Sequence, residues 1–183
     1  MIGLLIALFV EVVPVELRVQ SDALPRAEAV QLFRAVERRF RRQLGITLAL
    51  DSVSTVEPLY PPDSFRFWSD TVTAFYFAST SKDRRKLVAV IAPPVALAGH
   101  RWLGGASKGV CTFPGWFSFA VASADSRSYA SEIVLSHELA HLLGAEHGTG
   151  IMHPDAGAML STRRRRFSRA SRNQIYECLG GEQ

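Results

Sequence analysis

Several features of other protein classes are missing from this 183-residue chain. Its longest apolar run falls short of the roughly 18 residues that cross a bilayer, so we expect no stable membrane span. No internal repeat is visible, which argues against repeat architectures. Low-complexity sequence is confined to the four consecutive arginines at 163–166. That run lacks the aromatic or motif context of a nucleic-acid-binding surface, so we interpret it as a solvated loop and expect no nucleic-acid partner.

Cysteine is also scarce, and the chain contains Cys111 and Cys178 alone. A pair permits one disulfide, but spacing does not decide between a bridge and two reduced, buried thiols. Hydrophobic residues, by contrast, make up 48% of the chain and charged residues 21%, which is typical of globular proteins. The length suits one domain with a sizeable core.

The first twelve residues have two interpretations. Residues 2–10 form an apolar run as long as the core of a signal peptide, but no basic residue precedes it and Glu11 ends it. Residues 1–12 are therefore a degenerate export signal, the result of a start codon assigned downstream of the true one, or a plain buried segment. We assign residues 13–183 to a single domain.

Hydrophobic periodicity predicts alternating strands and helices. Alternating apolar residues favour a strand at 13–19, and Pro25 opens a helix that runs to about residue 43, where Gly45 ends it. Further strands are expected at 46–53, 87–92, 110–113 and 117–122. Three further helices are expected. The first covers 65–75, the second runs from a cap within 126–131 to about residue 143, and the third begins at Ser168 or Ser171. This order predicts an α/β fold with a mostly parallel sheet and an antiparallel edge strand.

One eleven-residue segment carries most of the functional information. His137 and His141 are one helical turn apart and project from the same face, where two imidazoles can hold one metal ion. Glu138 lies beside them and is placed to act as a general base on water. Gly144 lets the chain turn sharply, which would return His147 as a third ligand. Three nitrogens and one open position are the ligand set of a catalytic zinc ion. A buried helix with histidines facing the core explains neither Gly144 nor His147.

The spacing His-Glu-x-x-His-x-x-Gly-x-x-His resembles that of the metzincin metallopeptidases. Ile151-Met152-His153-Pro154 is similar to the methionine turn of that family. The resemblance implies a zincin fold with a long active-site helix, a methionine turn formed by Met152 and a terminal helix. It also implies one catalytic zinc ion, and peptide bonds in proteins as substrate. By this resemblance the domain divides into residues 13–144 and a small C-terminal subdomain, 145–183.

Within the metzincins, the chain looks most like the adamalysin (reprolysin, ADAM-type) branch. The glycine-rich stretch 104–119 is similar to the segment of that branch in which a cysteine follows the third strand, and Cys178 sits where its closing cysteine does. The resemblance implies a Cys111–Cys178 disulfide and hence an oxidising compartment. Gly148 follows the third histidine, where adamalysins usually carry aspartate. Bacterial or minimal metzincins therefore remain an alternative.

The family also suggests where a substrate binds. An exposed strand before the active-site helix, here about 108–113, would add the peptide as a further strand. A specificity pocket would form after the methionine turn, within 153–160. The candidate substrate-binding residues are Val110, Cys111, Thr112, His153, Pro154 and Ala158.

These observations favour a zinc-dependent endopeptidase that is secreted or extracytoplasmic and monomeric. Two alternatives stay open. The first is a catalytically silent domain that binds a protein partner, although the intact ligand set and Glu138 argue against it. The second is a zinc hydrolase of small peptides or amides.

Overall fold

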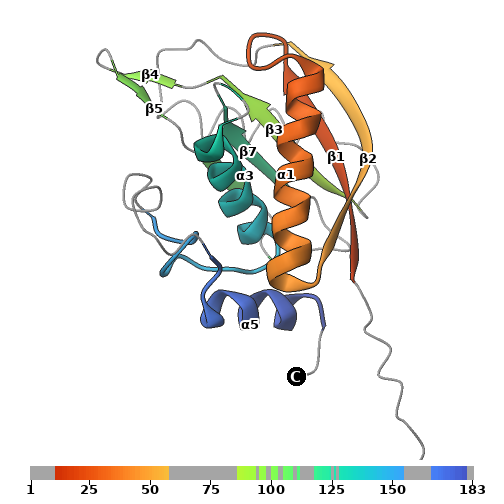
Figure 1. Ribbon diagram of the computed structural model, residues 1–183, viewed down its shortest axis with the longest axis vertical. Helices are drawn as coiled ribbons and strands as arrows, with labels where there is room; N and C mark the ends of the chain where they lie inside the picture. Colours follow the sequence, from red (N-terminus) through yellow and green to blue (C-terminus); the bar gives the residue numbers. More distant parts are fainter. Residues whose placement is uncertain are drawn as a thin grey trace, which may run out of the picture.

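A five-stranded sheet forms the centre of the fold, in the strand order β2-β1-β3-β7-β6, with helices packed against it (Figure 1). The computed structural model describes residues 11–57, 86–93, 95–97, 100–102, 105–108, 111, 118–124, 126, 128–154 and 166–180. The strands are β1 Val12–Gln20, β2 Thr47–Val56, β3 Leu87–Ala92, β6 Gly105–Lys108 and β7 Ser118–Ser123, and a separate antiparallel pair is formed by β4 Val95–Leu97 and β5 His100–Trp102.

The sheet has the predicted mixed character. β2, β1, β3 and β7 run parallel to their neighbours, and β6 pairs antiparallel with β7 at the edge. The predicted edge strand was misplaced, however. The strand is Gly105–Lys108, whereas Cys111, expected within a strand at 110–113, lies in a turn with a φ of 53°. The sequence around Gly105 is glycine-rich and gives no strand pattern, but pairing with the apolar strand β7 holds Gly105 extended.

Sequence pattern explains the burial of two of the inner strands, β1 and β3. β1 buries alternate residues in its first half, where Val13, Val15 and Leu17 are fully buried, and its last four residues, 17–20, are all buried. β3 lies between β1 and β7 with every residue buried, which is why its sequence is one continuous apolar run.

Helix α1, Arg26–Leu44, connects β1 to β2 and covers one face of the sheet (Figure 1). Its buried side chains, among them Leu32, Phe33, Val36 and Phe40, recur at helical spacing. Gly45 ends it with a φ of 69°, as the sequence predicted.

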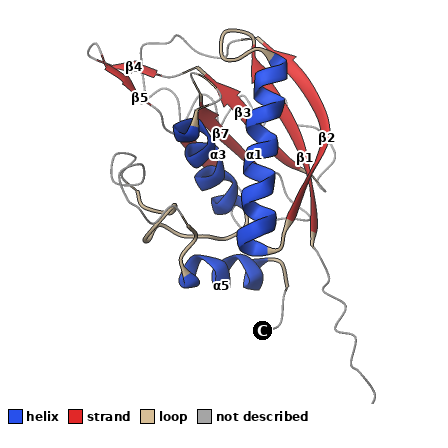
Figure 2. Ribbon diagram, viewed as in Figure 1, coloured by secondary structure: helices blue, strands red, loops and turns tan. Residues whose placement is uncertain are grey.

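Helix α3, Tyr129–Leu142, lies beside α1 on the same side of the sheet and packs against β7 and β6 (Figures 1 and 2). The side-chain oxygen of Ser128 caps it by accepting a hydrogen bond from the Ser131 N–H. A partly buried ion pair between Arg39 Nε and Glu132 Oε1, 2.9 Å apart, joins α3 to α1.

Helix α5, Arg169–Cys178, begins after the predicted cap Ser168 and lies across the end of α1 (Figure 1). The Tyr176 hydroxyl donates to the Leu44 carbonyl over 2.7 Å, and the rings of Phe40 and Phe167 meet edge to face. The segment between α3 and α5 is loop as far as the structure describes it (Figure 2).

Several predictions fall outside the described residues: the helix at 65–75, the apolar run at 2–10, and the substrate-binding candidates Val110, Thr112 and Ala158. Among the helices that are described, none is long and apolar enough to span a membrane.

Candidate metal centre

The C-terminal half of α3 supplies the first three residues of the site. His137 and His141 are separated by one turn and share a face, and Glu138 follows His137. His137 is 6% exposed and Glu138 is 5% exposed, so both polar side chains are largely shielded from solvent. Burial on this scale requires partners for both groups.

A tight turn after α3 brings back the third histidine. Gly144 has a φ of 94°, the left-handed conformation that the sequence predicted. Space constrains it too, because a Cβ atom there would lie 2.8 Å from Cys178 Cβ and 3.2 Å from the Gln174 carbonyl oxygen. The turn is closed by a hydrogen bond from the Ala145 N–H to the Ala140 carbonyl. The chain is thereby redirected so that His147 faces the two helical histidines.

The three imidazoles converge on one point. One nitrogen from each of His137, His141 and His147 lies within 4.8 Å of the others. The centroid separations are 4.5 Å for His137–His141, 4.7 Å for His141–His147 and 5.4 Å for His137–His147. His137 is buried, His141 half-buried and His147 exposed, so the cluster opens to solvent on one side.

Hydrogen bonds to backbone carbonyls fix which nitrogen faces the centre. His137 Nδ1 donates to the Ile151 carbonyl over 2.7 Å, and His141 Nδ1 donates to the Ala145 carbonyl over 2.6 Å. Since a carbonyl can only accept, both rings carry their proton on Nδ1 and present a lone pair at Nε2. The two Nε2 atoms are 2.9 Å apart. Two lone pairs at this distance repel each other unless a cation lies between them, so the donor set fits a divalent metal ion.

Burial also keeps the histidines neutral, which metal binding requires. Desolvation lowers the pKa of His137 from 6.5 to about 4, an effect that the Ile151 hydrogen bond opposes and the neighbouring histidines increase. The pKa of His141 is lowered for the same first reason, desolvation, with a further contribution from His147.

Glu138 lies next to the histidine cluster and against strand β6. Its Oε1 is 4.0 Å from His137 Nε2. Burial raises the pKa of Glu138 from 4.5 to about 8, and a hydrogen bond from the Ser107 side chain opposes that rise. A divalent ion on the histidine nitrogens would favour the ionised carboxylate.

The segment predicted to form the methionine turn is a compact, hydrogen-bonded loop. Met152 is fully buried, and its carbonyl accepts from the N–H of Gly148, next to His147. Ile151 provides the carbonyl that orients His137. The turn thus supports two of the three histidines through its backbone.

The Cys111–Cys178 disulfide implied by the family resemblance is confirmed. The two Cα atoms are 5.3 Å apart, and the bridge joins the turn after β6 to the end of α5. The Cys111 N–H also donates to the Leu142 carbonyl at the end of α3. Three segments therefore meet beside the histidine site.

Comparison with solved structures finds two proteins of the same architecture. Metalloproteinase-II from Bacteroides fragilis matches with a TM-score of 0.63 at 15% identity, over 92% of this chain and 53% of that one. Archaemetzincin from Methanopyrus kandleri matches with a TM-score of 0.63 at 14% identity, over 92% of this chain and 96% of that one. The fold is that of these two proteins. The chain spans about half the length of the Bacteroides protein. No protein-family model and no curated protein sequence matches it.

This fold places the remaining predicted residues as follows. His153 and Pro154 follow the methionine turn, and His153 is half-buried while Pro154 is exposed. Cys111 lies in the disulfide-bonded turn rather than on the edge strand. Sequence reasoning missed the two carbonyls that orient the histidines, because a backbone carbonyl leaves no mark in the sequence. It also missed Gly105 and Ser107, which contact Glu138.

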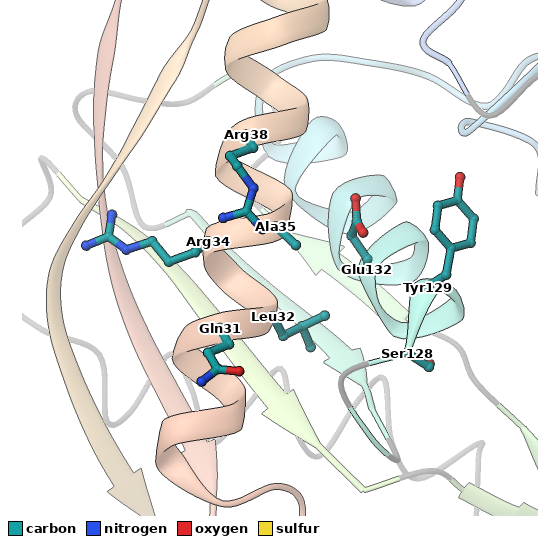
Figure 3. A pocket seen from close by; sticks show the side chains of 8 residues that line it. All are labelled: Gln31, Leu32, Arg34, Ala35, Arg38, Ser128, Tyr129 and Glu132. Carbon is teal, nitrogen blue, oxygen red and sulfur yellow. The ribbon is translucent and has the colours of Figure 1, made fainter.

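A separate cavity of about 490 Å³ lies between α1 and the start of α3 (Figure 3). Its lining includes Arg34 and Arg38 from α1 and Tyr129 and Glu132 from α3, and none of the three histidines. Ser128 on its wall is nine residues before His137, about 13 Å along the helix. The cavity is therefore not part of the histidine site.

Proposed function

We propose that the protein is a zinc-dependent endopeptidase, with His137, His141 and His147 as metal ligands and Glu138 as general base. The observation that carries the proposal is the opposed pair of Nε2 lone pairs, each fixed by an Nδ1–H bond to a backbone carbonyl. Three neutral imidazoles with one open side are the donor set of a hydrolytic zinc ion rather than a structural one. The likeness of the fold to a metalloproteinase and an archaemetzincin supports this reading.

The residues of the site have distinct tasks in peptide hydrolysis. Zinc, when bound, supplies a Lewis acid for the scissile carbonyl and lowers the pKa of a coordinated water. Glu138 accepts the proton of the attacking water on a carboxylate oxygen and later passes it to the leaving amine. His137 and His141 are held by the Ile151 and Ala145 carbonyls, so their nitrogens keep position during the reaction.

The edge strand β6 suits an extended peptide substrate. It pairs with β7 on one side and ends the sheet on the other, and it lies against Glu138. A peptide that adds as a further strand would pass beside the histidines in an extended conformation. This arrangement favours an endopeptidase over a hydrolase of small amides. His153 and Pro154, with Val110, Thr112 and Ala158, remain candidates for substrate contacts.

We infer the metzincin branch and the location of the protein from the disulfide. The resemblance to the adamalysin branch implies a bridge between these two cysteines, and a bridge joins the turn after β6 to α5. It supports that branch and an oxidising, secreted or extracytoplasmic location. We expect the enzyme to act as a monomer with one zinc ion.

Hydrolysis of casein by the zinc-loaded protein tests the function. We expect cleavage that a chelator abolishes and added zinc restores. Glu138→Ala should lose at least about 100-fold in kcat while it retains zinc, because it removes the general base and no ligand. A Glu138→Ala variant as active as the wild type would refute the assigned role, and a wild type that never cleaves casein would favour the silent partner-binding domain.

His147→Ala tests the ligand set. His147 is exposed and lies in a loop, so its loss should leave the fold intact. We expect zinc affinity to fall by more than about 100-fold, since even partners of ligands contribute 10–100-fold. Zinc content after dialysis and the circular dichroism spectrum measure the two effects. The His153→Ala variant, which removes a half-buried histidine outside the cluster of three, is compared alongside. Full zinc retention in His147→Ala would exclude the proposed site.

A further inference from the structure

Strand β6 contacts the side chain of Glu138 at two positions. Gly105 and Ser107 are two residues apart and so lie on the same face of the strand. Both are near the Glu138 carboxyl group, which reaches them from α3. The face that they share is therefore the one turned toward the histidine site.

Gly105 is required by space rather than by backbone conformation. A Cβ atom at this position would overlap Glu138 Cγ, Cδ and Oε1. The φ of Gly105 is not in the left-handed region, so other residues could adopt its backbone conformation. Any side chain here would displace the carboxyl group, which means that the strand packs directly on it.

Ser107 supplies the polar partner of the same group. Its hydroxyl hydrogen-bonds the Glu138 carboxyl group, which is 5% exposed and receives little help from water. A buried carboxyl group without such a partner would be costly and free to rotate. The hydroxyl therefore restricts the carboxyl group to one orientation.

We propose that Ser107 is a positioning residue that holds the Glu138 carboxyl group in register with the histidine nitrogens, in a space that Gly105 leaves open. The proposal rests on the proposed function, because it assigns the purpose of that orientation to catalysis. Since β6 is also the strand expected to bind the substrate, one strand would align both the peptide and the general base.

Kinetics separate this role from a purely structural one. Ser107→Ala should lower kcat by about 10–100-fold, with KM and zinc content unchanged, because partners that orient catalytic groups contribute on this scale. Ser107→Thr keeps the hydroxyl and should recover most of the rate. Ser52→Ala, which removes an exposed serine at the opposite edge of the sheet, should leave kcat unchanged. A Ser107→Ala variant with wild-type kcat, or with a change in KM alone, would overturn the proposal.

A second measurement needs no activity. In chelator-treated protein that keeps Glu138, we expect Ser107→Ala to lower Tm by about 3 °C. This shift corresponds to the loss of one buried hydrogen bond. The same substitution in a Glu138→Ala background should have no such effect, because the partner is already gone. Equal shifts in both backgrounds would refute the contact itself. If the wild type shows no hydrolysis while this coupling is found, the proposed function fails and the contact stands.

Discussion

At the scale of single residues, Glu138 makes the metal-free fold sensitive to alkali. Its pKa is about 8 when folded and 4.5 ordinarily, so between these values the folded protein keeps a proton that the unfolded chain releases. Stability therefore falls as pH rises through this window. His137 acts in the opposite sense below pH 6.5, because its folded pKa is about 4 and protonation favours unfolding. Between pH 6.5 and 8, the effect of Glu138 is no longer opposed by that of His137.

This predicts the behaviour of Glu138→Gln. In chelator-treated protein, the free energy of unfolding of the wild type should fall by about 1–2 kcal/mol from pH 6.5 to pH 8 through this group. Glutamine has no proton to release and should remove that part of the fall. Urea titrations at the two pH values measure the difference. Parallel pH profiles for the two proteins would show that Glu138 is not buried as described.

At the scale of elements, the turn that follows α3 depends on Gly144 for two reasons. The residue has a φ of 94°, and its missing Cβ lets Cys178 and Gln174 approach. Gly45 at the end of α1 offers a matched control, since its φ is 69° and no atom lies within 4 Å of the position of a Cβ. The two glycines thus separate backbone strain from close packing.

We expect Gly45→Ala to cost about 1 kcal/mol of stability through its left-handed backbone alone. Gly144→Ala should cost roughly 3 kcal/mol, because overpacking against α5 adds to the same strain. It should also weaken zinc binding, since the turn sets the position of His147. Denaturant unfolding and zinc titration of both variants measure these effects. An equal loss of unfolding free energy at the two positions would mean that close packing against α5 does not constrain Gly144.

An element can be predicted from the sequence when the interactions that form it act between residues close together in the chain. Periodicity predicted β1, α1, β3, β7 and α5 within a few residues, because alternation and caps act over neighbouring positions. The edge strand β6 was misplaced because its residues are small and glycine-rich, and pairing with β7 decides its place. The histidines could be predicted from spacing along one helix and one turn. Ser107 could not, because only folding brings it to Glu138.

At the scale of the whole molecule, the disulfide joins segments that are distant in the chain. Cys111 follows β6, Cys178 ends α5, and 67 residues separate them. Between the two lie α3 and its histidines, and Gly144 packs on Cys178. Gln174 of α5 also binds Glu146, the neighbour of His147, through the Glu146 N–H at 3.1 Å. The bridge therefore fastens α5 to the loop that carries the third histidine.

Replacing both cysteines by serine should act on stability and on the metal site together. Closing a loop of this length in the unfolded chain is worth about 4 kcal/mol by the chain-entropy relation, so the variant should unfold that much more easily. If the bridge only restricted the unfolded chain, the folded variant would bind zinc as the wild type does. The contacts of Gly144 and Glu146 with α5 predict instead a weaker zinc affinity, because α5 supports the His147 loop. Guanidinium unfolding and zinc titration at a temperature where the variant is folded distinguish these outcomes, and unchanged zinc affinity would confine the role of the disulfide to the unfolded state.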